Sequence, residues 1–309
     1  MLAQAVRRIG VPTQVRLPLA PMEHDSILSA AEPPLKRPAM MYHAHWGLQR
    51  SPFAGGEAPQ FFAGEGQTEA LARLRFVAEQ RRHALLTAGR GVGKTTLLRQ
   101  FAESRRYDGR PTAMISLAGL SPREFLWQTA AQLTLGPKAS DDAVQLFRRL
   151  HDHGAAIGWG AEGGTALLLD DADQAGADVR QQLLRLVSLA GGATPWLTIV
   201  LAASPSGARR MGDELLDALD LRIELEPWSE AEMVGYIQHA LLEAGAEQPI
   251  FDDEALGAMH ALADGVPRKI NRLADHALLG AAAEGRDSID AAMIEAAHDA
   301  LNWTTTAGG

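Results

Sequence analysis

The sequence predicts an α/β fold, in which a parallel sheet is flanked by helices, followed by a region that is helical throughout. Short apolar stretches alternate with helical patterns from residue 84 to residue 227, which is typical of a mostly parallel sheet covered on both faces. A glycine-rich turn joins the first apolar stretch to a helix. From Ser229 onward only helical patterns remain, separated by glycine or proline, which predicts a separate helical subdomain.

The elements follow one another in a regular order. Strands are expected where apolar or β-branched residues cluster, at 84–87, 112–117, 166–169, 194–204 and 221–227. Helices of the α/β region are expected at 67–82, 97–106, 121–133, 140–157, 179–190 and 207–219. The start of 121–133 is marked by Ser121 as N-cap, Pro122 after it and Glu124 as the capping-box acid. The later helices are expected at 229–245, 252–265, 267–285 and 290–301.

These elements divide the chain into four predicted parts. Residues 1–40 contain six prolines and no sustained hydrophobic period, so we expect a disordered tail. The α/β region is expected over residues 41–228, and the helical subdomain, which we call the lid, over 229–301. Residues 302–309 are expected to form a second disordered tail.

The composition limits the class of protein. The 309 residues are 46% hydrophobic, which is enough for one large or two modest domains. The absence of cysteine excludes disulfides and thiol catalysis and is compatible with the cytoplasm, where we expect the protein. A net charge of −9 argues against general affinity for nucleic acid, although a local basic face is compatible with it. The longest charge-free run, 186–208, is interrupted by glycines and a proline, so no membrane span is expected.

The turn after the first strand, ALLTAGRGVGKTT at 84–96, has the composition of a phosphate-binding loop (P-loop). Its glycines allow backbone angles that direct several N–H groups toward one anion. Those donors and the positive end of the next helix would hold the β-phosphate, while Lys94 reaches the β and γ oxygens and Thr95 ligates Mg²⁺. The expected nucleotide-binding residues of the loop are Ala88, Gly89, Arg90, Gly91, Val92, Gly93, Lys94, Thr95 and Thr96.

One position departs from the G-x-x-x-x-G-K-[ST] pattern, because Ala88 stands where the first glycine is expected. Alanine suits the end of a strand and Gly89 can supply the turn, so we interpret Ala88 as a tolerated variant. The alternative is a flexible loop that contains Gly-Lys-Thr by chance. A dinucleotide fingerprint is excluded, because Lys94 stands where the third glycine of G-x-G-x-x-G belongs.

A second motif, ALLLDDAD at 166–173, places acids at the carboxyl end of a buried strand, beside the P-loop. We expect Asp170 to ligate Mg²⁺ through water and Asp171 to orient or deprotonate the attacking water. Aspartate is one methylene shorter than the glutamate common at the second position, which predicts slow hydrolysis or an adjusted geometry. The alternative is an acidic helix cap that follows a strand.

Four further sites carry polar residues that could act on a nucleotide. Ser204 ends a strand, where its hydroxyl would touch the γ-phosphate or the attacking water, or would only cap the strand end. Arg222 and the pair at 209–210 are candidates for a charge donated to a neighbouring subunit's nucleotide, although each also fits a solvated surface arginine. Arg268 opens a lid helix after a proline, where it would reach back over the phosphates.

Two other groups of residues carry weaker signals. The histidine pairs His43/His45 and His151/His153 are not accompanied by a cluster of acids or cysteines, so no metal site is expected there. Aromatic residues precede the core without a basic stripe, which favours packing, or one wall of an adenine pocket, over stacking on nucleic acid; they are Trp46, Phe53, Phe61 and Phe62.

Taken together, these motifs resemble the AAA+ ATPases of the ExeA (general secretion pathway A) type, which are related to the TniB, TnsC and MuB transposition ATPases. The resemblance covers residues 41–301, from MYHAHWGLQRSPF through LLTAGRGVGKTTLLRQ, ALLLDDADQA and LEPWSEAEMVGYIQHAL to GVPRKINRLADHALLGAAAEG. It implies ATP and Mg²⁺ as cofactors, and residues 64–67 at the border of the adenine. It further implies the following roles: Lys94 and Thr95 in Walker A, Asp170 and Asp171 in Walker B, Ser204 as sensor 1, and Arg268 as sensor 2.

The function expected from this resemblance is ATP hydrolysis by a homo-oligomer that drives assembly or remodelling of a partner complex. One alternative is an ATP-gated scaffold that binds DNA, with incidental hydrolysis. Another is a regulator that binds nucleotide and hydrolyses little, which Asp171 would suit. Secretion-type members commonly continue into a membrane span and a peptidoglycan-binding domain, whereas this sequence ends soon after its last helix. That difference weakens the expectation of a secretion role and leaves the expectation of an ATPase unchanged.

Overall fold

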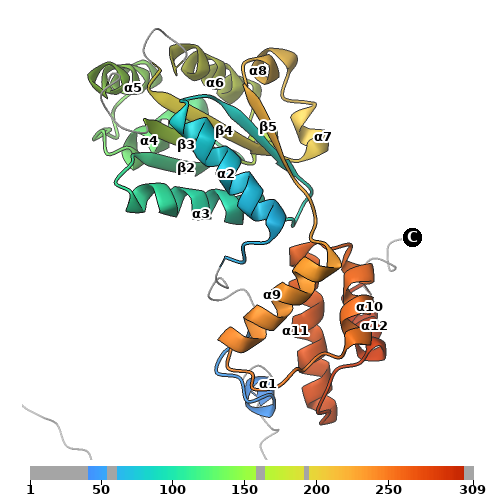
Figure 1. The fold of residues 1–309 in the computed structure, drawn as a ribbon. Helices are drawn as coiled ribbons and strands as arrows, with labels where there is room; N and C mark the ends of the chain where they lie inside the picture. The colour runs from blue at the N-terminus through green and yellow to red at the C-terminus, as the bar shows by residue number, and fades with distance from the viewer. Residues whose placement is uncertain (1–40, 54–60, 158–163, 191–194, 303–309) are drawn as a thin grey trace, which may run out of the picture. The chain divides into compact units, whose positions relative to one another are not determined.

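The computed structural model of the chain describes residues 41–53, 61–157, 164–190 and 195–302, all within one compact unit (Figure 1). The tail predicted at 1–40 lies outside the described residues, as does most of the tail predicted at 302–309.

A five-stranded sheet forms the centre of the α/β region. Every pair of neighbouring strands is parallel and the order is β2-β3-β4-β1-β5, which confirms the fold expected from the alternating pattern. The strands are β1 (Ala84–Ala88), β2 (Thr112–Ser116), β3 (Thr165–Asp170), β4 (Leu197–Ala203) and β5 (Leu221–Leu225). All residues of β1, β3 and β4 are buried, as expected for strands with helices on both faces.

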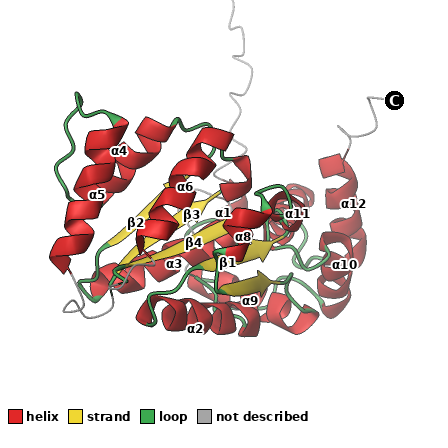
Figure 2. Cartoon of the chain, turned by 90° about the horizontal axis from the view of Figure 1, so that it is seen from above, coloured by secondary structure: helices red, strands yellow, loops and turns green. Residues whose placement is uncertain are grey.

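Helices cover the two faces of this sheet (Figures 1 and 2). One face packs against α2 (Glu65–Glu79) and α3 (Lys94–Tyr107). The opposite face packs against α4 (Pro122–Gln132), α5 (Ala143–Ile157), α6 (Ala177–Ala190), α7 (Pro205–Ala208) and α8 (Asp213–Asp217). Because all strands run the same way, the loops at their carboxyl ends meet along one edge of the sheet.

Local signals explain where α4 begins and why one predicted helix is in fact two. The capping box of α4 is present, with Ser121 and Glu124 each bonded to the other's backbone. The single helix expected at 207–219 is instead two short helices, α7 and α8. Gly212 between them has a φ of +96°, a conformation that a continuous α-helix cannot contain.

The lid is built from α9 (Glu230–Glu243), α10 (Asp253–Ala263), α11 (Pro267–Glu284) and α12 (Ala291–Asn302). Its hydrophobic cluster also contains Tyr42, Leu48 and Phe53, from α1 (Met41–His45) and the loop after it. This stretch therefore packs with the lid, although the predicted boundary grouped it with the α/β region (blue segment in Figure 1). Across the described ranges, no helix is both long enough and apolar enough to traverse a lipid bilayer.

Candidate functional site

The P-loop connects the end of β1 to the first turn of α3. Gly91 and Gly93 have φ values of +88° and +116°, which residues other than glycine rarely adopt. Gly89, in contrast, does not adopt a left-handed φ. It takes part in the turn through its carbonyl, which accepts from the Val92 backbone N–H at 3.4 Å. Ala88 is the last residue of β1, paired with Leu225 and fully buried, so an alanine is accommodated there without strain.

Lys94 is the first residue of α3 and is half-buried in the loop. Its ammonium group donates to the carbonyl oxygens of Ala88, at 2.9 Å, and Gly89, at 3.2 Å. Burial lowers the pKa of Lys94, although the nearby acids, above all Asp170 and Asp173, act in the opposite direction. An ammonium group whose partners are neutral carbonyls can exchange them for the more strongly interacting oxygens of a phosphate.

Thr95 and Asp170 lie side by side at the mouth of the loop. The Thr95 hydroxyl donates to the Asp170 carboxylate at 2.5 Å, and the Asp171 backbone N–H donates to the other carboxylate oxygen at 2.9 Å. Both groups offer oxygen, the ligand that Mg²⁺ prefers, and Mg²⁺ in phosphate sites usually takes only one or two protein ligands. The residues present therefore fit a magnesium ion that would complete its shell with phosphate oxygens and water.

The Asp171 side chain is held on both of its oxygens. One accepts from the hydroxyl of Ser116, at 2.9 Å, and the other accepts from the amide of Gln174, at 3.0 Å. Ser116 can do this because the β2–β3 register places it directly opposite Asp170. The backbone of Asp171 is left-handed, with φ +52°, a region in which aspartate is tolerated more often than most residues. Asp171 thus borders the site in a fixed orientation.

The hydroxyl of Ser204, at the end of β4, makes two hydrogen bonds. It donates to Asp173 at 2.6 Å and accepts from the backbone N–H of Gly207 at 3.0 Å. The second contact makes Ser204 the N-cap of α7. Gly207 has no room for a side chain, because a Cβ there would lie 1.8 Å from the Asp173 carboxylate. Ser204 therefore caps a helix and at the same time borders the cavity described below.

The lid meets the P-loop at the start of α11. The backbone N–H of Arg268 donates to the Gly91 carbonyl at 3.3 Å. A Cβ on Gly91 would lie 3.0 Å from the Arg268 Cβ and 3.1 Å from Val266, so the close approach depends on glycine. Asn271 follows one turn later and accepts from the Tyr236 hydroxyl at 2.7 Å. Burial raises the pKa of Tyr236 to about 12, which keeps this hydroxyl a donor.

These groups surround one cavity of about 870 Å³, within the range of ligand-binding pockets. Its lining joins the P-loop, the acids after β3, and the lid, and comprises Phe53, Arg90, Gly91, Gly93, Lys94, Thr95, Thr96, Asp170, Asp171, Asp173, Gln174, Ser204, Pro267, Arg268, Asn271 and Arg272. A smaller cavity of about 110 Å³ shares four of these residues, Gly93, Thr96, Pro267 and Asn271. Its other lining residues are Phe61, Phe62, Gln67, Val92, Trp228 and Tyr236.

Three predicted arginines lie elsewhere. Arg222 is exposed on β5, 4.0 Å from Glu224, and borders a different hollow beside α2. Arg209 and Arg210 are exposed after α7 and line neither cavity described above. None of the three is brought to this chain's own P-loop, which leaves their assignment to a neighbouring subunit's site as a proposal.

Several residues that border the cavity were not singled out from the sequence. Asn271 and Arg272 stand three and four positions after Arg268, a spacing that places side chains on one face of a helix, and this signal was available. Asp173 and Gln174 were visible only as the continuation of the acidic motif. Trp228 carried no signal, because its approach to the smaller cavity depends on tertiary packing.

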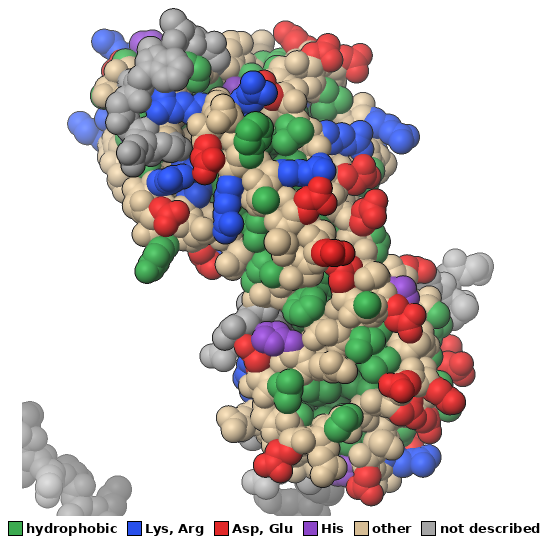
Figure 3. Space-filling model, viewed as in Figure 1, with side chains coloured by type: hydrophobic (Ala, Val, Ile, Leu, Met, Phe, Trp, Pro, Cys, Tyr) green, Lys and Arg blue, Asp and Glu red, His purple; other side chains and the backbone are tan. Residues whose placement is uncertain are grey.

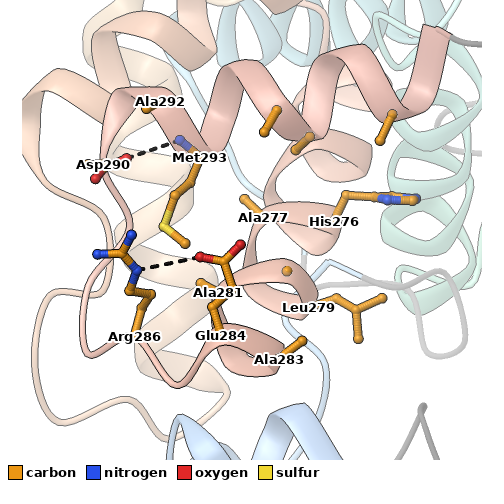
Figure 4. Close-up of a pocket in the computed structure, with 14 residues that line it drawn as sticks. His276, Ala277, Leu279, Ala281, Ala283, Glu284, Arg286, Asp290, Ala292 and Met293 are labelled. Atoms are coloured by element: carbon orange, nitrogen blue, oxygen red, sulfur yellow. Dashed lines mark hydrogen bonds and ion pairs between the residues drawn. The ribbon is translucent and has the colours of Figure 1, made fainter.

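A further hollow of about 480 Å³ lies between α11 and α12, away from all these groups (Figure 4). Alanine supplies half of its lining. Its charged residues interact within the hollow's own rim: Arg286 lies 3.5 Å from Glu284, and Asp290 accepts from the backbone N–H of Met293 at 3.0 Å. It contains none of the predicted site residues.

Comparison with known proteins supports the same fold and motifs. The family model described as "AAA domain" matches residues 77–212. General secretion pathway protein A of Aeromonas hydrophila is 31% identical over 256 residues, which are 81% of this chain and 46% of that protein. The chain therefore spans about half the length of this relative.

Solved structures agree at the level of the fold. The ORC1 protein of Aeropyrum pernix, solved in complex with DNA, has a TM-score of 0.61 and 15% identity, with 82% of this chain and 70% of that chain covered. The ORC2 protein of Aeropyrum pernix, solved as ADPNP–ADP complexes, has a TM-score of 0.58 and 17% identity, with 81% and 71% covered. The RuvB Holliday junction branch migration motor of Thermotoga maritima has a TM-score of 0.52 and 20% identity, with 78% and 70% covered.

Proposed function

We propose that this chain, which belongs to the AAA+ ATPases of the general secretion pathway protein A type, binds Mg-ATP and hydrolyses it to drive assembly or remodelling of a partner complex. The observation that carries the proposal is the contact of the Thr95 hydroxyl with the Asp170 carboxylate, in one cavity with Lys94 and Arg268. This combination provides oxygen ligands for a hard cation and cations for a polyphosphate, which is the complement of Mg-ATP.

Each group has a defined task in this proposal. The backbone N–H groups of the P-loop and the Lys94 ammonium hold the β- and γ-phosphates. Bound Mg²⁺, held by Thr95 and Asp170, would neutralise charge on the phosphate oxygens. Asp171 orients the attacking water and accepts its proton, and Arg268 stabilises charge on the γ-phosphate from the lid side.

The metal assignment can be tested by measuring ATP affinity with and without Mg²⁺ by calorimetry. We expect Thr95→Ala to remove most of the gain in affinity that Mg²⁺ provides and to leave metal-free ATP binding within about 3-fold of the original. Thr68→Ala, at an exposed position on α2, is the matched control and is expected to retain the full Mg²⁺ effect. An unchanged Mg²⁺ effect in the Thr95 variant would contradict the assigned metal site.

Homo-oligomerisation is part of the proposal, because Arg222 is exposed and lies outside its own chain's nucleotide cavity. If Arg222 acts on the neighbour's nucleotide, Arg222→Ala and Asp171→Asn chains should each be inactive alone. Mixed oligomers should regain activity, because an intact Asp171 and an intact Arg222 then meet at one interface. The same mixing experiment with Arg209→Ala or Arg210→Ala distinguishes the three candidates.

A second candidate is an ATP-gated scaffold or regulator that binds DNA and hydrolyses little. The favouring observation is a set of exposed arginines on and after α2 and α3, Arg75, Arg82 and Arg99. On the face in Figure 3, Lys and Arg occur mainly over the α/β region, while Asp and Glu predominate over the lid. The lid residues 229–302 contain 14 acidic and four basic residues. ATP-driven assembly on duplex DNA, without turnover above background, would favour this candidate over the hydrolase.

A further inference from the structure

The lid has a hollow of about 340 Å³ between the second half of α9, the chain that follows it and the start of α10. We call it the α9–α10 hollow; it shares none of its described lining residues with the two cavities of the candidate site or with the hollow in Figure 4. Its buried lining is apolar and comprises Ile237, Leu241, Ala246, Ile250, Phe251 and Leu256. Its exposed rim comprises Gln238, Leu242, Glu247, Gln248, Pro249 and Asp253. An apolar centre inside a polar rim is the usual arrangement of a protein-binding site.

Backbone hydrogen bonds hold the walls of the α9–α10 hollow in place. The Ala246 N–H donates to the Leu241 carbonyl at 3.0 Å, which turns the chain at the end of α9. The segment before α10 is held by Ile289, whose N–H donates to the Ile250 carbonyl at 2.8 Å and whose carbonyl accepts from the Asp252 N–H at 3.1 Å. A site that is formed before binding loses little conformational entropy when its partner arrives.

Leu242 indicates that the occupant is larger than the hollow itself. Its side chain is 69% exposed at the rim, whereas Leu241 beside it is buried in the lining. A single exposed leucine is common on protein surfaces, but one that adjoins a buried apolar lining enlarges the apolar surface. Figure 3 shows hydrophobic side chains gathered on the lid, with acidic side chains around them. A small molecule inside the hollow would leave Leu242 in water, while a polypeptide laid across the rim would cover it.

The charges of the rim indicate the chemistry of that polypeptide. Glu247 and Asp253 are both exposed, and neither forms an ion pair with another described residue. None of the described residues in the lining is basic, and the first turn of α10 adds Glu254. This negative charge repels the phosphate groups of nucleic acids and of anionic lipids, and it attracts Lys and Arg side chains.

We propose that the α9–α10 hollow is the docking site for a basic amphipathic helix of a partner protein. The apolar side chains of such a helix recur at i, i+3, i+4 and i+7, so they would enter the hollow and cover Leu242. Its Lys or Arg residues would lie at the rim, within reach of Glu247 and Asp253. This surface is separate from the candidate nucleotide site, and the inference does not rest on the proposed function.

The first experiment selects binders from a phage-displayed library of random peptides on the full chain. Peptides that also bind the Leu242→Ser chain are discarded, which removes those that bind elsewhere. Leu242 is exposed, so this variant should keep the wild-type melting temperature. We expect the retained peptides to combine Lys or Arg with bulky apolar residues at helical spacing. No retained peptide, or retained peptides without Lys and Arg, would overturn the proposal.

The second experiment measures the affinity of the strongest retained peptide by fluorescence anisotropy. Glu247→Lys should weaken binding by about 10-fold, because it places a like charge against the basic peptide. Glu295→Lys is the matched control: it changes the net charge equally, at an exposed position on α12 outside the hollow, and should keep the affinity within about 3-fold. Wild-type binding should also weaken when the salt is raised from about 0.05 M to about 0.5 M. Equal losses in the two variants, or no loss in either, would contradict docking at this rim.

A second copy of this chain is the rival occupant, and sedimentation velocity tests it. Leu242→Ser should sediment as the wild type does, because the proposed partner is a different protein. Leu279→Ser is the control, on the hollow in Figure 4, where Leu279 is 40% exposed. A loss of self-association in the Leu242 variant, with the Leu279 variant unchanged, would assign the hollow to a second copy and overturn the proposal.

Discussion

The Ser116 hydroxyl donates to the Asp171 carboxylate over 2.9 Å and so ties the carboxyl end of β2 to the residue after β3. Gln174 occupies the other carboxylate oxygen. A short acid anchored in this way borders the cavity and has little freedom to advance into it. A longer acid at the same position would extend past both partners toward the phosphates.

Substitution of Asp171 tests this geometry directly. Asp171→Asn should lower turnover by roughly 10²-fold or more, because the amide can still accept from Ser116 but cannot take a proton from water. ATP affinity should barely change, since Lys94 and Asp170 remain. Asp171→Glu should keep or raise turnover. A phosphate-release assay with calorimetry as control measures both effects, and full turnover by the Asn variant would exclude Asp171 as the base.

Removal of the Lys94 ammonium should weaken nucleotide binding. Lys94→Ala is expected to reduce ATP affinity by about 10-fold or more, equivalent to about 1.4 kcal/mol or more, because a charge-assisted contact is lost. Lys138→Ala is the control, at an exposed position between α4 and α5 that is not part of the cavity. Calorimetry that finds equal ATP affinity in both variants would contradict the phosphate-loop assignment.

Gly91 is expected to be intolerant of a side chain. Gly91→Ala should lower both the melting temperature and ATP affinity, at a cost of about 1–3 kcal/mol in stability, because its φ is +88° and a Cβ would press on Arg268 and Val266. Gly280→Ala is the opposite case. Gly280 lies in the interior of α11, and a Cβ added there would meet no atom of another element within 4 Å. It should raise stability by about 0.5–1 kcal/mol. Thermal unfolding of the two variants would show whether the signs differ.

His83 should make stability depend on pH. Its Nδ1 accepts from the Ile199 backbone N–H at 3.1 Å, which requires an unprotonated nitrogen, and burial lowers its pKa while Asp220 partly opposes this. Because the unfolded chain then binds the proton more readily, stability is complete above the unfolded pKa of 6.5 and decreases as the pH falls below it.

Replacing this histidine should remove the dependence. Asn can still accept the hydrogen bond from the Ile199 N–H, and it does not titrate. As the pH is lowered from 7 to below 6.5, the free energy of unfolding should therefore decrease less in His83→Asn than in the wild type. His151→Asn, at an exposed position on α5, should leave the wild-type slope intact. Equal slopes in wild type and His83→Asn, from denaturant unfolding at each pH, would show that another group is responsible.

Local patterns predicted the elements of this protein because their causes are local. The apolar residues before Asp170 indicate a buried strand from their composition alone. The capping box of α4 involves only Ser121 and Glu124, so it does not depend on contacts with other elements. The break at Gly212 was missed because a single glycine within a helical pattern is often tolerated.

The candidate site was predictable only as far as its motifs extend. Lys94, Thr95 and Asp170 meet because the P-loop and the end of β3 share an edge of the sheet. The anchoring of Asp171 by Ser116 requires the β2–β3 register, which no pattern in either segment specifies. Trp228 likewise reaches its cavity through packing in the lid, a long-range effect.

The packing of α1 with the lid also sets the order in which the chain can fold. The Tyr42 hydroxyl donates to Asp275, a partner 233 positions later, and the Trp46 indole donates to a carbonyl 232 positions later. Contacts between residues so far apart in the sequence form slowly, because a long loop must close before they stabilise the fold. During synthesis the apolar side chains of α1 cannot be buried until α9–α12 have emerged from the ribosome. The lid is therefore completed late. The residues of α1, which are the first described residues to be synthesised, are among the last to be buried.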